Sequence, residues 1–510
     1  MKKWTEGMGT RINSKYDIVE PRAAAMIESL RAFGYTLPAA IADLVDNSIS
    51  AGARKTWIDF VWNGAASCIS IADDGCGMTL KQLVNAMRPG TQNPLDERDP
   101  SDLGRFGLGL KTASFSQCRR LTVRSRPKDG RRSTRCWDLD YVNETDEWRL
   151  LSDIDPDTIG RISELDNRPC GTVVLWESLD RLVADTDAED EKSKHRFLEM
   201  VDDVEKYLAM VFHRFMSGSR PLRIYINGTE KHNLVAPWSP FLEDHPATQQ
   251  VQSERLQFKG ASIKISAFVL PHHDKLDKDL FQAAAGPRGW NAHQGFYVYR
   301  NKRLLVPGDW LGFGFAKEEH YKLARLQIDI PNSIDGDWSI DVKKSHARPP
   351  AAIRKDLKRI ADLTRKRAVE VYRHRGKTLA RKSSQPHVFA WKPVKRGQKN
   401  FYAINRQHPM VHRALAVPEE HRSAVKSLLR LLEETVPVEQ IWLDKSDAPD
   451  DHGRPFEHVR EKELVEIMTE VFRVFREDGF SVREARCRVL AMDAFADYPH
   501  IVATLKDKES

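Results

Sequence analysis

Residues 36–53, which read TLPAAIADLVDNSISAGA, constrain the fold of this chain more than any other stretch. Its apolar side chains recur at the spacing of one helix face and are Ile41, Leu44, Val45 and Ile49. Its polar side chains gather on the other face and are Asp43, Asp46, Asn47 and Ser50. Such a polar stripe is most often just the solvated side of a surface helix. The glycine-rich segments that follow favour a functional face instead.

Two glycine-rich segments follow this helix in the chain. A strand-like run at 67–72 leads into residues 73–78, which read DDGCGM. Residues 104–112, which read GRFGLGLKT, open a second apparent helix. Either segment alone is weak, because Asp-Gly hairpin turns and glycine turns are common. At the start of a helix, however, backbone N–H groups and the helix dipole favour a phosphate.

Taken in order, the three segments resemble the nucleotide-binding motifs of the GHKL ATPases. This superfamily includes gyrase-type subunits, MutL proteins, the large heat-shock chaperones, histidine kinases and MORC proteins, and the resemblance covers roughly residues 20–350. It implies an α/β (α+β) architecture in which helices pack on a mixed sheet as a Bergerat-fold sandwich. A ribosomal-protein-like α/β transducer domain and a mainly helical C-terminal region would follow, as in MORC-like and MutL-like prokaryotic proteins.

The resemblance assigns an adenine-binding role to the DDGCGM segment. Asp73 stands where a carboxylate accepts a hydrogen bond from the adenine amino group. Gly75 and Gly77, followed by Met78, let the backbone approach the base closely. Thr172 matches a threonine that assists the same contact, although by itself it reads as an ordinary strand residue.

The resemblance also implies a site for magnesium and phosphates. Asn47 matches the magnesium ligand, and its neutral carbonyl oxygen is a hard donor of the kind that Mg²⁺ prefers. A lid at 88–104 would close over ATP and exclude water. The residues implied to cradle the phosphates are Gly104, Gly107, Gly109, Lys111 and Thr112.

The position of the general base departs from the superfamily pattern. That base is usually a glutamate four residues before the magnesium asparagine, and this chain has Asp43 there. The shorter side chain loses about 1 Å of reach, which is a distance that matters for rate. Asp46 is the reserve candidate, and Ser50 replaces an acid usually found near the end of the motif. The sequence therefore supports ATP binding more firmly than ATP hydrolysis.

Residues 295–305, which read GFYVYRNKRLL, resemble the "strand, Asn-x-Arg, strand" hairpin of the transducer domain, although any basic hairpin shares part of this pattern. In the superfamily a transducer lysine reaches the γ-phosphate. Residues 341–345 lie where this lysine is expected, which leaves Lys343 and Lys344 as equal candidates.

The domain organisation follows from these motifs and from changes in composition. We expect strands at 222–226, 262–269 and 326–330 to belong to the second α/β unit, and a linker at 383–399. The expected divisions are an N-terminal arm (1–19), the ATPase domain (20–180), the transducer domain (181–350), a basic helix with its linker (351–400) and a C-terminal partner-associated or DNA-associated region (401–510).

Positive charge is concentrated in one stretch. Residues 351–400 carry 16 Lys and Arg against three acids, whereas the whole chain has a net charge of only +7. The rest of the chain is therefore net acidic, and the basic block, with its long helix at 352–382, points to a polyanionic partner, most plausibly DNA. The alternative is a solvated helix without a ligand.

Cysteine usage and hydropathy bear on the compartment. The six cysteines are scattered without CxxC pairs, which favours reduced thiols and no zinc site. No apolar run approaches the roughly 20 residues needed to span a bilayer, and the first residues lack the apolar segment of a secretion signal. We therefore expect a cytoplasmic protein that does not contact a membrane.

The motifs together predict an ATP- and Mg²⁺-binding GHKL ATPase that dimerises on ATP and acts on DNA. Clamping or remodelling of DNA in repair, compaction or restriction-like defence would suit such a protein. The alternative from another class is a nucleotide-gated scaffold or chaperone-like protein with little or no turnover. Residues 401–510 are in either case a candidate region for docking partner proteins.

Overall fold

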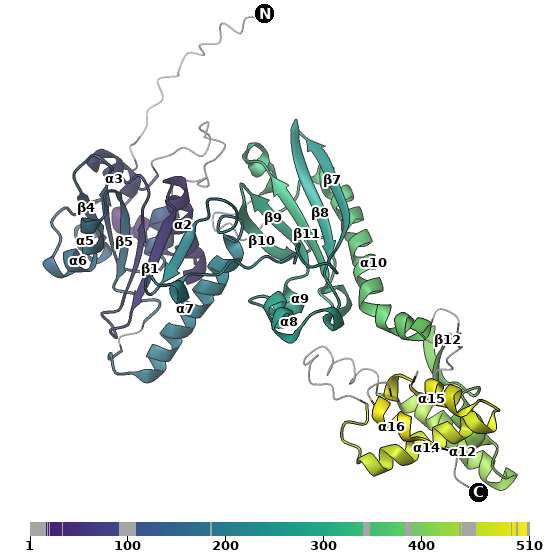
Figure 1. Cartoon of the computed structure of the whole chain (residues 1–510). Coiled ribbons are helices and arrows are strands. Elements are labelled where there is room, and N and C mark those ends of the chain that lie inside the picture. The colour runs from purple at the N-terminus through teal and green to yellow at the C-terminus, as the bar shows by residue number, and fades with distance from the viewer. Residues whose placement is uncertain are drawn as a thin grey trace, which may run out of the picture. The chain divides into compact units, whose positions relative to one another are not determined.

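The structure, a computed structural model, describes residues 17, 19, 21–90, 109–339, 347–382, 390–437, 440 and 455–506 (Figure 1). Short gaps lie inside these ranges at 33, 184–185, 397–398, 491 and 496–497. The chain forms two compact units, residues 1–368 and 369–510. None of the helices in the described ranges combines the length and the apolar character that a membrane crossing requires.

The first sheet of the N-terminal unit has six strands in the order β4-β3-β5-β2-β1-β6. All neighbours pair antiparallel except β1 and β6, which are parallel. The strands are β1 (Lys55–Val61), β2 (Cys68–Asp73), β3 (Arg120–Arg126), β4 (Ser133–Asp138), β5 (Gly171–Glu177) and β6 (Arg223–Ile226). With the helices described next, this mixed sheet confirms the expected α/β fold class.

Strand β6 corrects one expectation. We expected residues 222–226 to belong to the second α/β unit, but β6 lies at the edge of the first sheet, where Ile224 pairs with Thr56 of β1. The first sheet therefore draws on residues well beyond position 180. A short apolar strand carries no local signal for the sheet that it joins, so only the tertiary contacts settle this point.

Helices cover one face of the first sheet. They include α1 (Ala23–Arg31), α2 (Leu37–Ser50), α4 (Gly109–Phe115) and α7 (Glu191–Val211). The apolar face predicted for α2 is buried in a core shared with Ile58 of β1 and with Ile69 and Ile71 of β2. Since successive side chains of a strand point to opposite faces, the strand residues between these core positions face the other side of the sheet. There a smaller apolar cluster includes Ala72 of β2 and Val173 of β5. The shorter helices of this region are α3 (Leu80–Met87), α5 (Leu139–Thr145) and α6 (Pro156–Arg161).

The second sheet has five strands in the order β10-β9-β11-β8-β7. They are β7 (Gln249–Phe258), β8 (Ala261–Val269), β9 (Gly295–Arg300), β10 (Arg303–Asp309) and β11 (Ala324–Ile330), accompanied by α8 (Lys278–Ala285) and α9 (Gly289–Ala292). The predicted hairpin at 295–305 is present, and its two turn residues, Asn301 and Lys302, have φ of 47° and 70°. Two left-handed residues are the signature of a tight type I′ turn. Strand β7 was not predicted, because its polar sequence carries no apolar run.

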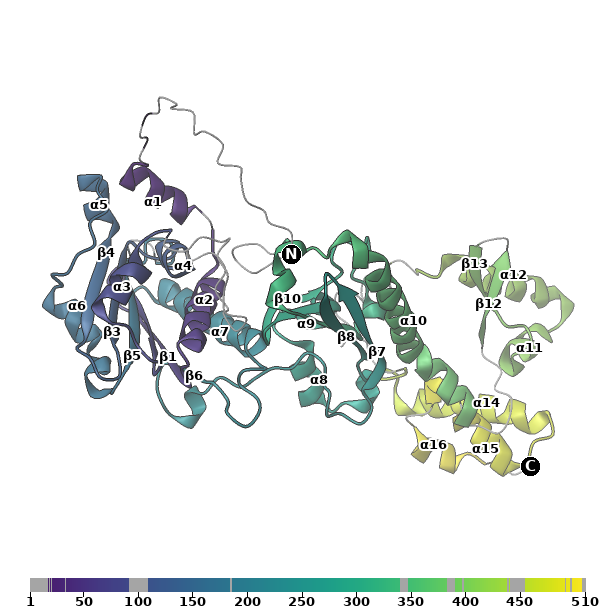
Figure 2. The same ribbon diagram turned by 90° about the horizontal axis from the view of Figure 1, so that it is seen from above.

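The predicted basic helix is α10 (Ala351–Lys382). Its part up to residue 368 runs beside the second sheet in both views (Figures 1 and 2), with Arg359 bonded to Glu254 of β7 at 2.7 Å. Ile353, Leu357 and Ile360 are buried at the spacing of one helix face.

The C-terminal unit begins with a β-hairpin. Its strands, β12 (Trp391–Arg396) and β13 (Lys399–Ile404), correct the expectation that 383–399 is only a linker. The helices that follow are α11 (Pro409–Leu415), α12 (Glu419–Thr435), α14 (Glu461–Glu477), α15 (Val482–Leu490) and α16 (Pro499–Thr504). A core that includes Leu464, Met468 and Phe472 of α14 holds the last three helices together, so the expected helical character of this region is confirmed.

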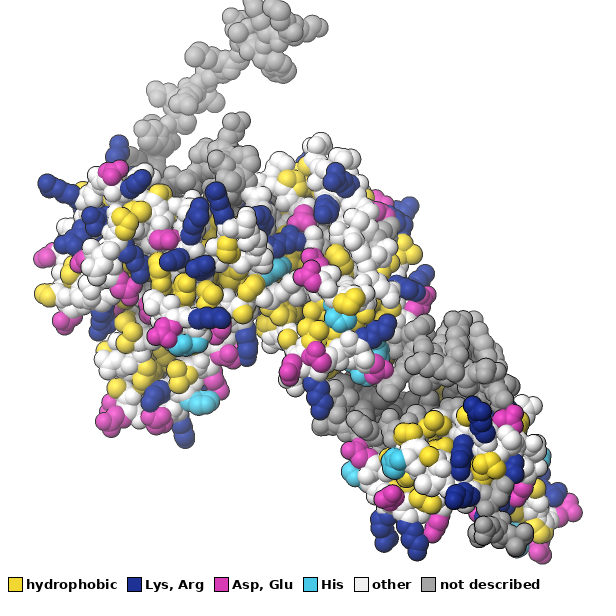
Figure 3. Space-filling model, in the orientation of Figure 1, with side chains coloured by type: hydrophobic (Ala, Val, Ile, Leu, Met, Phe, Trp, Pro, Cys, Tyr) yellow, Lys and Arg dark blue, Asp and Glu magenta, His cyan; other side chains and the backbone are white. Residues whose placement is uncertain are grey.

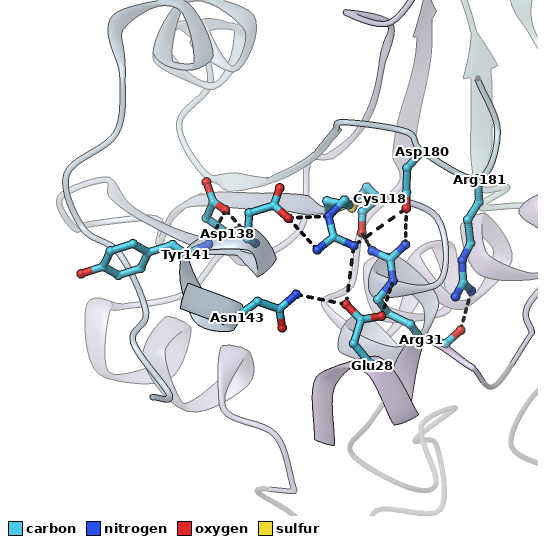
Figure 4. Close-up of polar contacts among 10 residues, drawn as sticks. Glu28, Arg31, Cys118, Asp138, Tyr141, Asn143, Asp180 and Arg181 are labelled. Atoms are coloured by element: carbon cyan, nitrogen blue, oxygen red, sulfur yellow. Dashed lines mark hydrogen bonds and ion pairs between the residues drawn. The ribbon is translucent and has the colours of Figure 1, made fainter. Parts of the chain in front are cut away.

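A charged network fastens α1 to the first-sheet region (Figure 4). The Arg31 side chain is 2% exposed, and its guanidinium donates to the Asp180 carboxylate at 2.6 Å and to the Cys118 carbonyl at 3.2 Å. Glu28 lies 3.5 Å from Arg31 and accepts a hydrogen bond from Asn143. Arg181 closes the network by donating to the Arg31 carbonyl at 2.6 Å.

We expect Arg31→Met to lower the free energy of unfolding by about 2–3 kcal/mol, because it leaves partly buried acceptors without their cation. Urea denaturation followed by circular dichroism measures this loss. Arg22→Met is the matched control, since Arg22 pairs with Asp146 but is 77% exposed, and its loss should stay below about 1 kcal/mol. Equal losses in the two variants would contradict the structural role of Arg31.

Candidate nucleotide site

The predicted adenine contact, Asp73, ends β2 and is 7% exposed. Its Oδ1 accepts a hydrogen bond from the Gly75 N–H at 2.8 Å, and its Oδ2 accepts one from the Ser48 hydroxyl at 3.1 Å. Burial raises the pKa of Asp73 above its ordinary value, while these hydrogen bonds oppose that shift. The carboxylate is therefore held in one orientation by α2 on one side and by the glycine loop on the other.

Thr172, the second residue predicted to contact adenine, lies on β5 directly opposite Asp73. Its hydroxyl and that of Ser125 are 2.8 Å apart, and the Ser125 hydroxyl also accepts from the Met78 N–H at 2.8 Å. Three predicted residues, Asp73, Met78 and Thr172, are thus brought to one place by strands that are distant in sequence.

Glycine is required at two positions of this loop. Gly77 has φ of +66°, and a Cβ there would lie 1.9 Å from the Arg126 carbonyl oxygen. Gly171, just before Thr172, has φ of +138°, and a Cβ there would lie 2.2 Å from the Asp73 carbonyl oxygen. The backbone packs too closely at both points for any side chain, which explains the glycine pattern around Asp73.

The other end of the site lies along α2. Asn47 is exposed although Asp46 and Ser48 on either side of it are buried, so its amide is open to a ligand. Asp43, one turn earlier, is 4% exposed, and its Oδ2 accepts from the Tyr35 hydroxyl at 2.9 Å. A Cβ built on Gly109, at the start of α4, would lie 3.5 Å from the same Oδ2. The residues thus present a carboxylate, an open amide oxygen and a glycine backbone, a donor set that fits magnesium and phosphate.

Lys111 and Thr112 are both buried in α4. The Lys111 ammonium donates to the Ala86 carbonyl in α3 at 2.9 Å, and burial lowers the pKa of Lys111 to about 8. Gly104 and Gly107, most of the 88–104 lid, and both Lys343 and Lys344 lie outside the described residues.

Asp46, the reserve candidate for the base, has a different partner. The Arg303 Nε donates to its Oδ1 at 2.9 Å and to its Oδ2 at 3.2 Å, and both side chains are 2% exposed. Burial by itself would lower the pKa of Arg303, but Asp46, Tyr207 and Asp43 together outweigh burial, so the pKa is raised. An ion pair this enclosed makes Asp46 a poor candidate for activating water.

Sequence reasoning missed the residues that hold the site in place. These are Tyr35, Ser48, Ser125 and, as a partner of Asp46, Arg303. Ser48 lies on α2 between the apolar residues Val45 and Ile49, so its position in the sequence does not single it out. The others lie on elements whose contact with α2 or the glycine loop cannot be read from local periodicity.

Comparison with known proteins agrees with this geometry. Residues 35–172 match the family described as "Histidine kinase-, DNA gyrase B-, and HSP90-like ATPase". The DNA mismatch repair protein MutL of Haemophilus influenzae is 37% identical over 101 residues, which is 19% of this chain and 15% of the relative. ATPase morc-1 of Caenorhabditis elegans is 35% identical over 91 residues, or 18% of this chain and 10% of the relative.

The resemblance to GHKL ATPases is therefore confirmed for residues 35–172, which match this ATPase family and are similar to MutL and MORC proteins. The match extends over only 15% and 10% of the length of the two relatives. It supports ATP binding by this domain.

Proposed function

We propose that this protein binds ATP with Mg²⁺ at the α2 site, hydrolyses it, and acts on DNA. The observation that carries the proposal is the arrangement along α2. One end of the helix holds the buried Asp73 carboxylate through Ser48, and Asp43 and the open Asn47 share its polar face. This arrangement suits a nucleotide whose base lies at Asp73 and whose phosphates lie beside Asn47 and Asp43.

Each residue has a proposed role. Asp73 accepts from the adenine amino group, and Thr172 assists through the Ser125 hydroxyl. Asn47 would hold Mg²⁺, which when bound neutralises charge on the phosphates. Asp43, oriented by Tyr35, accepts a proton from the attacking water. Asp43 rather than Asp46 is the base in this proposal, since Asp46 is paired with Arg303.

Further parts of the proposal rest on the superfamily resemblance. The 88–104 lid and the glycines Gly104 and Gly107 would enclose the phosphates, and Lys343 or Lys344 would contact the γ-phosphate. Closure of the lid on ATP would bring two copies of the ATPase domain together as a homodimer in the cytoplasm. The DNA task would be clamping or remodelling in repair, compaction or defence.

The DNA part of the proposal rests on α10 and on the relatives, one of which is named as a DNA mismatch repair protein. Some basic residues of α10 are used for packing: Arg365 stacks 3.8 Å from the Tyr321 ring, and Arg359 pairs with Glu254. Lys355, Lys358 and Lys366 are exposed. On the face in Figure 3, Lys and Arg side chains of the N-terminal unit are interspersed with Asp and Glu.

We expect the triple variant Lys355→Glu, Lys358→Glu, Lys366→Glu to lose at least about tenfold in affinity for duplex DNA near 0.1 M salt. The slope of the logarithm of DNA affinity against the logarithm of salt concentration should also become shallower by up to about three, or one for each lost phosphate contact. Fluorescence anisotropy measures both. DNA-stimulated ATP turnover should fall with DNA affinity, whereas ATP binding should not change.

The matched control reverses three exposed lysines elsewhere, Lys128, Lys192 and Lys231, and so changes the net charge equally. This control should keep its DNA affinity within about twofold if local contacts dominate over net charge. Equal losses in both triple variants, or none in the α10 variant, would refute DNA binding through α10.

A nucleotide-gated scaffold is the second candidate function. The shorter Asp43 at the base position favours it, and so does α12, whose Leu428 and Leu431 are 56% and 59% exposed. Exposed apolar surface of this kind is typical of contacts between proteins. ATP binding without turnover, with or without DNA, would favour the scaffold over the ATPase.

A further inference from the structure

A buried ion pair connects the two sheets of the N-terminal unit. Asp46 belongs to α2, beside the first sheet, and Arg303 begins β10 of the second sheet, 257 residues away. The Arg303 Nε lies 2.9 and 3.2 Å from the two carboxylate oxygens of Asp46. The two side chains are 2% exposed, so water screens the pair very little.

Several contacts fix the position of Arg303. The type I′ turn at Asn301 and Lys302 sets where β10 begins. A guanidinium N–H donates to the Leu304 carbonyl at 2.7 Å, and the guanidinium carbon lies 4.6 Å from the centre of the Phe212 ring, just after α7. A planar guanidinium held by a ring face, a carbonyl and a carboxylate has little freedom to turn.

Asp46 is next to the candidate magnesium ligand in sequence and one helical turn from the candidate base. Any rotation of the last turn of α2 moves Asn47 together with Asp46, because both belong to the same rigid turn. Displacements of about 1 Å are enough to lower catalytic rates by about 100-fold. The Asp46 anchor therefore bears directly on how Asn47 meets its ligand.

We infer that Arg303 is a positioning residue for the nucleotide site: by holding Asp46, it sets the orientation of Asn47 from the second sheet. The inference rests on the proposed function of that site and deepens it. In this inference the β9–β10 hairpin contributes to the magnesium site through Arg303, although no residue of the hairpin needs to touch the nucleotide. A shift of the hairpin would change how well Asn47 holds the ion, and bound ion would in turn favour one hairpin position.

The test compares Arg303→Met and Asp46→Asn with Arg214→Met. Arg214 is the matched control: it pairs with Asp329 of β11 and stacks 3.4 Å from the Tyr299 ring, so its contacts are with the second sheet. Two readouts are used. The first is the Mg²⁺ concentration that half-saturates binding of a fluorescent ATP analogue, and the second is hydrogen exchange of peptides covering 41–52.

We expect Arg303→Met and Asp46→Asn to raise the half-saturating Mg²⁺ concentration by about 10–100-fold, as loss of a residue that orients a metal ligand does elsewhere. Binding of the analogue without Mg²⁺ should change far less. Exchange in 41–52 should accelerate in both variants, and Arg214→Met should show neither effect. Arg303→Lys, which keeps the charge but not the planar geometry, should show an intermediate Mg²⁺ dependence and serves if Arg303→Met does not fold.

The double variant Asp46→Asn, Arg303→Met separates positioning from stability. With both buried charges removed, its thermal midpoint should recover toward that of the natural sequence, while the Mg²⁺ defect should remain. Recovery of both together, or an unchanged Mg²⁺ dependence in the single variants, would overturn the inference. If the natural sequence binds no nucleotide, the proposed function fails, and unchanged exchange of 41–52 in Arg303→Met separately refutes the anchor.

Discussion

Asp43→Asn is expected to lower the rate of ATP hydrolysis by at least about 100-fold, the usual contribution of a general base. ATP affinity should change by less than about threefold, because the amide oxygen can still accept from the Tyr35 hydroxyl and no other candidate ligand is altered. Steady-state phosphate release gives the rate, and equilibrium titration with ATP and Mg²⁺ gives the affinity. A large change in turnover without a change in binding would identify Asp43 as a residue that acts in the transition state.

Asp59→Asn is the control for this experiment. Asp59 is also a partly buried aspartate, on β1, but it faces the opposite side of the first sheet, near Glu164 and Arg168. Its replacement should leave turnover unchanged. Full turnover in Asp43→Asn would refute its role as base, and no turnover in the natural sequence would favour the scaffold function.

Asp73→Asn is expected to weaken ATP binding by at least about 100-fold, since a site built for one hydrogen-bonding pattern rejects its mismatch strongly. The asparagine side chain would carry one acceptor instead of two. Either it gives up the hydrogen bond from Gly75 or Ser48, or it turns an N–H toward the adenine amino group. Isothermal titration with ATP measures the loss, and the preference for ATP over GTP should fall with it.

Asp74→Asn provides the matched control one residue away. The Asp74 carboxylate accepts from the Arg54 and Lys55 N–H groups at 2.7 and 2.9 Å and so closes the loop without belonging to the adenine contact. We expect this variant to lose some stability but to keep its ATP affinity. Equal affinities in Asp73→Asn and the natural sequence would show that adenine is not recognised by Asp73.

Elements with a local pattern could be assigned from the amino-acid sequence alone. The spacing of Ile41, Leu44 and Val45 decided the buried face of α2, because a helix repeats every 3.6 residues wherever it lies. The strand-like run at 67–72 and the long helix at 352–382 were likewise predicted locally and are β2 and α10, whereas the β9–β10 hairpin was expected from the superfamily resemblance. The glycines around Asp73 were also readable, since the close backbone approach at Gly77 tolerates no side chain.

Which elements contact one another could be established only from the three-dimensional fold. Strand β6 pairs with β1 rather than with the second sheet, and the charge of Asp46 is matched by an arginine 257 residues away. Tyr35 and Ser125 belong to the site through hydrogen bonds that the sequence around each residue does not predict. The physical reason is that periodicity specifies which face of an element is buried, whereas the partner of that face is selected by packing and charge complementarity over the whole fold.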